Sequence, residues 1–122
     1  NRLLGVGKLD LEAVYEQNIN LTLGTDGLSS NISLSLWDEM RSALMLHPKW
    51  ELNTLAQTLL KSVTCNAAHA LKLPCGVLEK ERYADIIVAT LPQACELADV
   101  PLQLILQTKQ THLTFINGEK QC

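Results

Sequence analysis

The spacing of apolar residues changes once along this chain of 122 residues, and that change constrains the fold most. Between Ser35 and Leu71, apolar side chains recur every three or four residues, which is the period of an amphipathic helix. After Pro74 the apolar runs are short and are separated by turn residues, which is typical of strands. The sequence therefore predicts an α/β chain with a mainly helical first part and a β-rich second part.

Helices are expected at residues 9–18, 35–46, about 54–62 and about 66–71, and in the second half of 97–107. The helix at 35–46 is the strongest of these predictions. Ser35 with Asp38 three residues later forms a capping-box pattern, and Pro48 ends the apolar stripe.

Strands are expected at residues 19–23, 76–78, 84–89 and 112–116. The first of them alternates and is partly β-branched, and Gly24 breaks it. Asn117-Gly118 follows the last predicted strand and is the strongest short hairpin signal in the chain. The second part should therefore contain a small antiparallel sheet that ends in a tight turn.

Composition narrows the classes of function. The net charge of −3 and the lack of a basic cluster argue against nucleic acid as a partner, and the apolar runs are too short to span a membrane. The four cysteines have no metal-binding spacing, and we interpret them as reduced thiols of a cytoplasmic protein. There is no initiator Met and no signal-peptide pattern, so we expect a cut chain whose upstream part is missing.

An acidic residue directly after a predicted strand is the first candidate for chemistry. Asp26 follows residues 19–23, and in parallel α/β folds the loops at the carboxyl ends of strands converge on one pocket. An Asp at that position can bind a metal ion or accept a proton from water. Asp26-Gly27 is also a common turn dipeptide, and spacing alone favours this simpler interpretation.

Several stretches resemble, in the right order, enzymes of the amidohydrolase superfamily in its chlorohydrolase and deaminase branch. They are Asn1 with Leu3-Leu4, Leu23-Gly24-Thr25-Asp26-Gly27 with Ser30-Asn31 and Leu36-Trp37-Asp38-Glu39-Met40-Arg41, Thr64 to Leu71, Gly76 to Val88, and Phe115-Ile116-Asn117-Gly118. The strings at residues 1–4 and 26–36 look most like the aminodeoxyfutalosine deaminases of epsilonproteobacteria, which act in a route to menaquinone.

The resemblance implies a particular division of the chain. Residues 1–73 would form the last strand and helices of a (β/α)8 barrel, and residues 74–122 would supply strands of a composite β-sandwich. One departure stands in the sandwich turn, where Glu81 occupies the position of a Gly. Because Gly at such a turn permits a positive φ, this departure puts the local geometry in doubt.

The resemblance also implies a metal-dependent aminohydrolase that deaminates an adenine-type nucleoside. Asp26 would contact a zinc or iron ion and take a proton from the activated water. Asn1 and Arg2 would lie near the substrate, and Ser30 and Asn31 would hold the loop. The family's histidine ligands are absent from this chain. We therefore expect the chain alone to be inactive and to bind no stoichiometric metal.

Two alternatives stay open. The same fold can carry another reaction, as in a chlorohydrolase or a different deaminase, or the chain can be a non-catalytic module for stability or subunit contacts. The expected partners are the nucleoside substrate, the missing N-terminal barrel segment and a second copy in a homodimer, but neither nucleic acid nor a membrane. The three histidines, His47, His69 and His112, lack ligand spacing and are expected to be structural or surface residues.

Overall fold

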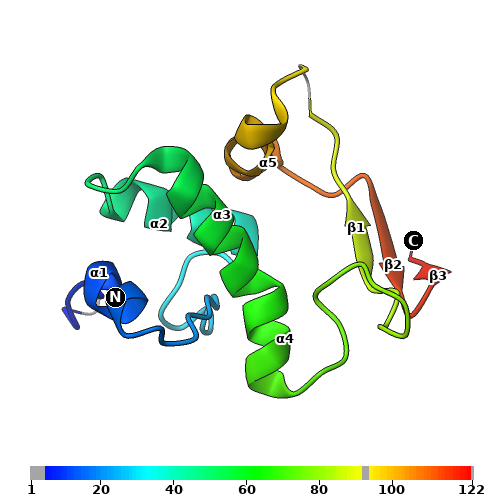
Figure 1. Cartoon of the computed structure of the whole chain (residues 1–122), viewed down its shortest axis with the longest axis horizontal. Coiled ribbons are helices and arrows are strands. Elements are labelled where there is room, and N and C mark those ends of the chain that lie inside the picture. The colour runs from blue at the N-terminus through cyan, green and yellow to red at the C-terminus, as the bar shows by residue number, and fades with distance from the viewer. Residues whose placement is uncertain (1–4, 92–93, 122) are drawn as a thin grey trace.

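A computed structural model describes residues 5–91 and 94–121, and the helices and the sheet form two separate parts of it (Figure 1). The helical elements are α1 (Leu11–Glu16), α2 (Leu36–Leu46), α3 (Leu52–Val63), α4 (Cys65–Leu71), a 3-10 turn at Leu97–Asp99 and α5 (Val100–Gln107). The strands are β1 (Ile86–Val88), β2 (Leu113–Ile116) and β3 (Glu119–Lys120). Within these ranges no helix is long and apolar enough to cross a membrane.

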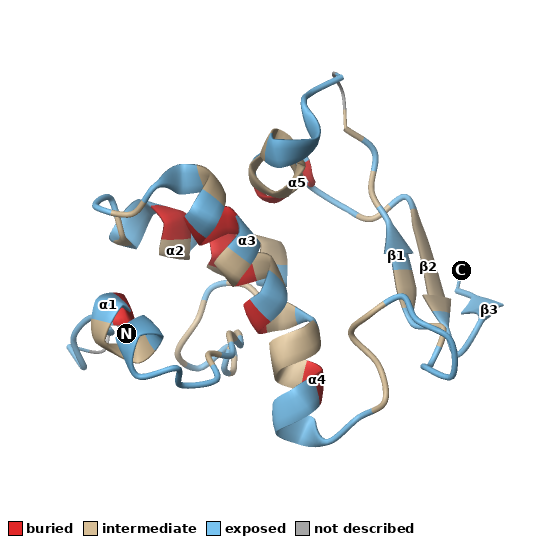
Figure 2. Cartoon of the chain, viewed as in Figure 1, coloured by how far each residue is buried: buried red, intermediate tan, exposed pale blue. Residues whose placement is uncertain are grey.

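The hydrophobic core lies between α2, α3 and α5, which pack on one another. Met40 of α2, Leu55 of α3 and Ile105 of α5 are at most 1% exposed. Figure 2 shows buried positions on these helices and also on α1 and α4, whereas the sheet carries none. Burying one such side chain stabilises a fold by about 1.5–3 kcal/mol, so these contacts fix the three helices relative to one another.

Ser35 is the N-cap residue of α2, as predicted, but the predicted capping-box bond is absent. The carboxylate of Asp38 instead accepts hydrogen bonds from Ser33 Oγ and from Arg41 Nη2, both at 2.7 Å. Both carboxylate oxygens of Asp38 thus accept hydrogen bonds from other side chains and not from the backbone N–H of Ser35. Asp38 and Glu39 still place two acidic residues in the first turn of α2, where the helix dipole favours negative charge.

The sheet has the antiparallel order β1-β2-β3. Ile86 pairs with Phe115 in the first ladder and Ile116 pairs with Glu119 in the second. The two strands of the second ladder are joined by Asn117 and Gly118 alone, with φ values of 51° and 83°. Positive φ at both turn residues matches the right-handed twist of the strands, so the predicted hairpin is confirmed.

The strand predicted at residues 19–23 is wrong for the described chain, where this segment pairs with no other strand. Two of its backbone groups are bonded to the helices instead: Leu23 N donates to Ser62 O at 3.2 Å, and Leu21 O accepts from Asn66 Nδ2 at 3.0 Å. A strand needs a second strand to complete its ladder. Alternation in the sequence indicates which side chains share a face, but it does not indicate whether a second strand lies beside the segment.

The strand predicted at residues 76–78 is also wrong. Gly76 has a φ of +83°, and a Cβ atom there would lie 2.8 Å from Thr64 O and 2.9 Å from Ala68 Cβ. The chain therefore turns tightly against the start of α4 and cannot continue as a strand. The next predicted strand, at 84–89, is confirmed only over Ile86–Val88.

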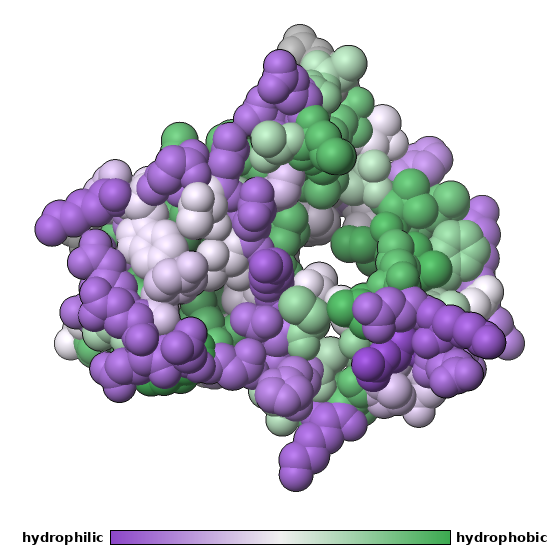
Figure 3. Space-filling view, viewed as in Figure 1, coloured by the Kyte–Doolittle hydropathy of each residue, from purple (hydrophilic) through white to green (hydrophobic). Residues whose placement is uncertain are grey.

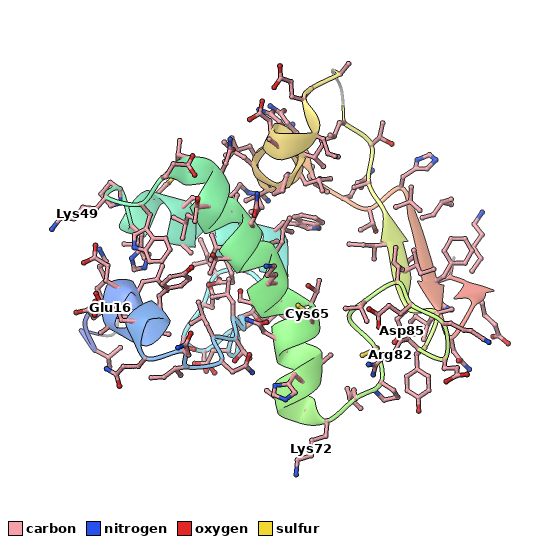
Figure 4. The ribbon with its side chains drawn as sticks, in the orientation of Figure 1. Glu16, Lys49, Cys65, Lys72, Arg82 and Asp85 are labelled. Carbon is pink, nitrogen blue, oxygen red and sulfur yellow. The ribbon has the colours of Figure 1, made fainter. Side chains whose placement is uncertain are left out.

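Glu81 adopts the backbone conformation that the resemblance assigned to a Gly, with a φ of 67°. A non-glycine residue in this region costs about 1–3 kcal/mol. The turn is closed by a bond from Arg82 N to Glu79 O, and Asp85 Oδ1 ties it to the hairpin by accepting from Asn117 N at 2.8 Å. Arg82 and Asp85 lie together beside β1 in Figure 4. The local geometry is thus kept without glycine.

Hydrophobic surface remains outside the core. On the face in Figure 3, hydrophobic residues surround the hollow between the helices and the sheet. In the loop after Asp26, Leu28 is 66% exposed and Ile32 is 93% exposed.

Candidate active site

Asp26 lies in the loop between residues 19–23 and α2, and its side chain is exposed. Its φ is 57°, in the left-handed region that few residues other than glycine adopt. Asp tolerates this region better than bulkier residues, and the strain of about 1–3 kcal/mol persists only where neighbouring contacts hold it. Backbone strain of this kind is concentrated at functional sites.

Ser30 holds one oxygen of the Asp26 carboxylate. Its hydroxyl donates to Asp26 Oδ2 at 2.7 Å and also lies 3.2 Å from Gly27 O. Asp26 Oδ1 has no hydrogen-bond partner among the residues that the structure describes. The carboxylate is therefore oriented through one oxygen, while the other is available to a ligand or a proton.

Asn31 connects the loop of Asp26 to α2. Its Nδ2 donates to Thr25 O at 2.7 Å and to Glu39 Oε1 at 2.5 Å, and its Oδ1 accepts from Ile32 N at 2.8 Å. Glu39 was not among the site residues that the sequence predicted. Periodicity gave no signal, since the contact joins a helix residue to a loop residue.

Asp26 fits a divalent cation as a single ligand, because it offers a free, exposed carboxylate oxygen, a donor that zinc and iron accept. Within residues 5–91 and 94–121 no group of three or more His, Cys, Asp or Glu side chains is close enough to hold a metal ion. The predicted substrate contacts Asn1 and Arg2 fall outside the described residues.

The histidines lie on separate elements: His47 at the end of α2, His69 on α4 and His112 just before β2. His47 is half-buried, and burial, followed by the positive charge of Lys8, lowers the pKa of its imidazole below the usual 6.5. The loss of solvent around the ring disfavours its cationic form. Nothing in this placement gathers the histidines around Asp26.

A polar depression of about 340 Å³ lies at the end of α5. It is lined by Thr90, Gln107, Thr108, Lys109, Gln110, Thr111 and His112. Residues of the Asp26 loop do not take part in it. Its side chains are mostly exposed and neutral, and they show no arrangement of a nucleophile with a base.

The sequence of this chain matches the model of the amidohydrolase family over residues 1–120. An aminodeoxyfutalosine deaminase of Nitratiruptor sp. is 37% identical over 121 residues, which cover 98% of this chain and 29% of that protein. A 5-methylthioadenosine/S-adenosylhomocysteine deaminase of Thermococcus sibiricus is 43% identical over 91 residues, covering 72% of this chain and 22% of that protein.

A solved structure is also similar. The crystal structure of Helicobacter pylori aminofutalosine deaminase in complex with methylthio-coformycin superposes with a TM-score of 0.89 at 38% identity. The match covers 93% of this chain and 28% of that one. The chain thus spans less than a third of the length of the relatives that it matches.

Proposed function

Because this chain belongs to the amidohydrolase family, we propose that it is the C-terminal part of a metal-dependent aminohydrolase that deaminates an adenine-type nucleoside. The proposed substrate resembles aminodeoxyfutalosine, which would place the enzyme in menaquinone biosynthesis in the cytoplasm. The observation that carries the proposal is the Asp26 carboxylate, exposed in a strained loop and held through one oxygen. The names and identities of the relatives support the reaction class.

In this proposal residues 1–73 complete a (β/α)8 barrel and residues 74–122 contribute to a β-sandwich. The unpaired segment 19–23 supports the first part, because a neighbouring strand of the barrel would complete its ladder. The exposed side chains of Leu28 and Ile32 support it too, because another part of the protein would cover them. An N-terminal segment and a second subunit are the proposed partners, together with the nucleoside.

A zinc or iron ion bound at Asp26 would supply the acidity that brings the pKa of a water molecule near neutrality. Asp26 accepts the proton of that water at Oδ1, the oxygen that Ser30 leaves free. The oxygen of the deprotonated water would bond to the ring carbon that carries the amino group. The same carboxylate would return the proton to the amine as the C–N bond breaks, so that ammonia departs. Ser30 keeps Oδ2 in place during both transfers. Asn1 and Arg2 are proposed to contact the substrate.

Asp26→Asn in the intact protein tests this function. Asparagine keeps the shape of the side chain but cannot accept the proton, so ammonia release should fall about 10²–10⁴-fold. Metal removal by a chelator should abolish activity, and added zinc or iron should restore it. Near-wild-type deamination by Asp26→Asn would remove Asp26 from the mechanism.

The choice of substrate needs its own test, because the relatives carry the names of different nucleoside deaminases. A panel of aminodeoxyfutalosine, 5'-methylthioadenosine, adenosine and a chlorinated ring substrate, assayed for ammonia and chloride, separates the candidates. Release of chloride alone would indicate a chlorohydrolase. An intact, metal-loaded protein that is inactive on every member would favour the non-catalytic module.

A further inference from the structure

Glu39 reaches the loop of Asp26 through a single intermediate side chain. Glu39 Oε1 accepts a hydrogen bond from Asn31 Nδ2 at 2.5 Å, and the same nitrogen donates to Thr25 O at 2.7 Å. Thr25 O is the carbonyl of the peptide bond that enters Asp26. We propose that Glu39 is a positioning residue for Asp26, acting through Asn31; this inference rests on the proposed function.

The amide of Asn31 has only one orientation that satisfies these contacts. A carbonyl oxygen and a carboxylate oxygen both accept and never donate, so the group that faces Thr25 and Glu39 must be the NH₂. Both of its protons are then used, and Oδ1 is used by Ile32 N at 2.8 Å. Asn31 therefore cannot flip or turn away without losing three bonds at once.

The hydrophobic core fixes the position of Glu39 on α2. Glu39 precedes Met40, which is 1% exposed, and Leu44 one turn further along α2 is 7% exposed. These two side chains hold the orientation of α2 against α3, so Glu39 is presented to the loop from a rigid helix. The core thereby sets where Asn31 lies, and Asn31 sets where the peptide bond before Asp26 lies.

The peptide bond between Thr25 and Asp26 needs the contact with Asn31 because the backbone of Asp26 is strained, with a φ of 57°. A bond from Ser30 orients the carboxylate itself but does not fix the peptide bond before it. Loss of the Glu39 contact would let Asn31 and the Thr25 carbonyl move, and Asp26 would relax toward an ordinary conformation. A misplacement of about 1 Å at a reacting group lowers a rate by about 10²-fold.

The test uses steady-state ammonia release by the intact enzyme, with kcat and KM measured for each variant. Glu39→Ala should lower kcat about 10- to 100-fold with little change in KM, because substrate binding does not involve Glu39. Alanine has a high helix propensity, so α2 loses only the favourable interaction of the Glu39 charge with the helix dipole. Glu39→Gln should stay within about fivefold of wild type, since its amide oxygen still accepts the bond, although a neutral one is weaker.

Four further variants complete the design. Asn31→Ala should reduce kcat at least as much as Glu39→Ala does, because it also removes the bond to Thr25 O. The double variant should be no worse than Asn31→Ala alone, since Glu39 acts only through Asn31. Glu16→Ala, an exposed acid on α1 (Figure 4), should leave kcat unchanged. If Glu39→Ala prevents folding, Asn31→Asp keeps the volume but removes both donors, and it should reduce kcat at unchanged KM.

Wild-type kcat in Glu39→Ala, while Asp26→Asn is inactive, would overturn the positioning role and leave the proposed function intact. Equal losses in Glu39→Gln and Glu39→Ala would overturn it as well, because the acceptor would then be irrelevant. Activity retained in Asp26→Asn would instead remove the proposed function and this inference together.

Discussion

The guanidinium of Arg41 lies 2.7 Å from the carbonyl oxygen of Ile105, and this contact joins α2 to the last turn of α5. The same nitrogen donates to Thr108 O at 2.9 Å, just beyond the end of α5. These are carbonyls that a helix leaves without partners of its own, and a cation is favoured there. Arg41 thus links α2 to the end of α5, two elements that are far apart in sequence.

Replacing Arg41 should therefore destabilise the protein without touching Asp26. Arg41→Ala removes the bonds to Ile105 O and Thr108 O together with the ion pair to Asp38 at 2.7 Å. We expect the free energy of unfolding to fall by about 1–3 kcal/mol, measured by urea denaturation. Arg41→Lys should recover only part of it, since an ammonium cannot span both carbonyls and Asp38. Full recovery by lysine would contradict this account.

Asp38 should make stability depend on pH in the acid range. The hydrogen bond from Ser33 and then that from Arg41 hold the pKa of the Asp38 carboxyl below its ordinary 3.8. Its ionised form therefore favours the folded state above pH 3.8, and this contribution is lost as the pH falls through the lowered folded-state pKa. Asp38→Asn should flatten that part of the profile of melting temperature against pH. An unchanged acid limb in Asp38→Asn would show that other carboxyls produce it.

Gly76 and Gly118 provide a matched pair, because both have a φ of +83°. A Cβ at Gly118 would meet only Ala84 Cβ at 3.8 Å, so Gly118→Ala should cost about 1–2 kcal/mol for backbone strain alone. At Gly76 it would come within 2.8 Å of Thr64 O, and Gly76→Ala should cost more. Urea denaturation of both variants measures the difference, and equal losses would refute the close approach of the chain to α4.

Leu55 should be the most sensitive leucine in the helical part, because it is 0% exposed in the centre of the core. Leu55→Ala should lower the free energy of unfolding by about 2–5 kcal/mol through lost burial and the cavity left behind. Leu97 is 87% exposed and serves as the control, since Leu97→Ala should change stability by less than about 0.5 kcal/mol. Similar effects at the two positions would mean that the core lies elsewhere.

Local signals predicted those elements whose stabilising contacts are local. The helix at 35–46, the helix in the second half of 97–107 and the Asn117-Gly118 turn were predicted because periodicity, prolines and turn residues act over a few neighbours. The strand at 19–23 was wrong because a strand depends on a partner that its own residues do not specify, and the strand at 76–78 was wrong because the chain turns at Gly76 against the start of α4. Asp26, Ser30 and Asn31 were selected from a motif, whereas Glu39 was visible only once α2 was placed beside the loop.

The sequence by itself determined the family of this chain, its helices, its closing hairpin and the acidic residue of its candidate site. Those properties depend on residue order and on contacts between near neighbours. Only the tertiary structure decided that Asp26 is strained, that Ser30 orients its carboxylate and that Glu39 supports it through Asn31. Hydrogen bonds require atoms within about 3 Å, and it is the packing of α2 in the core that brings these side chains that close.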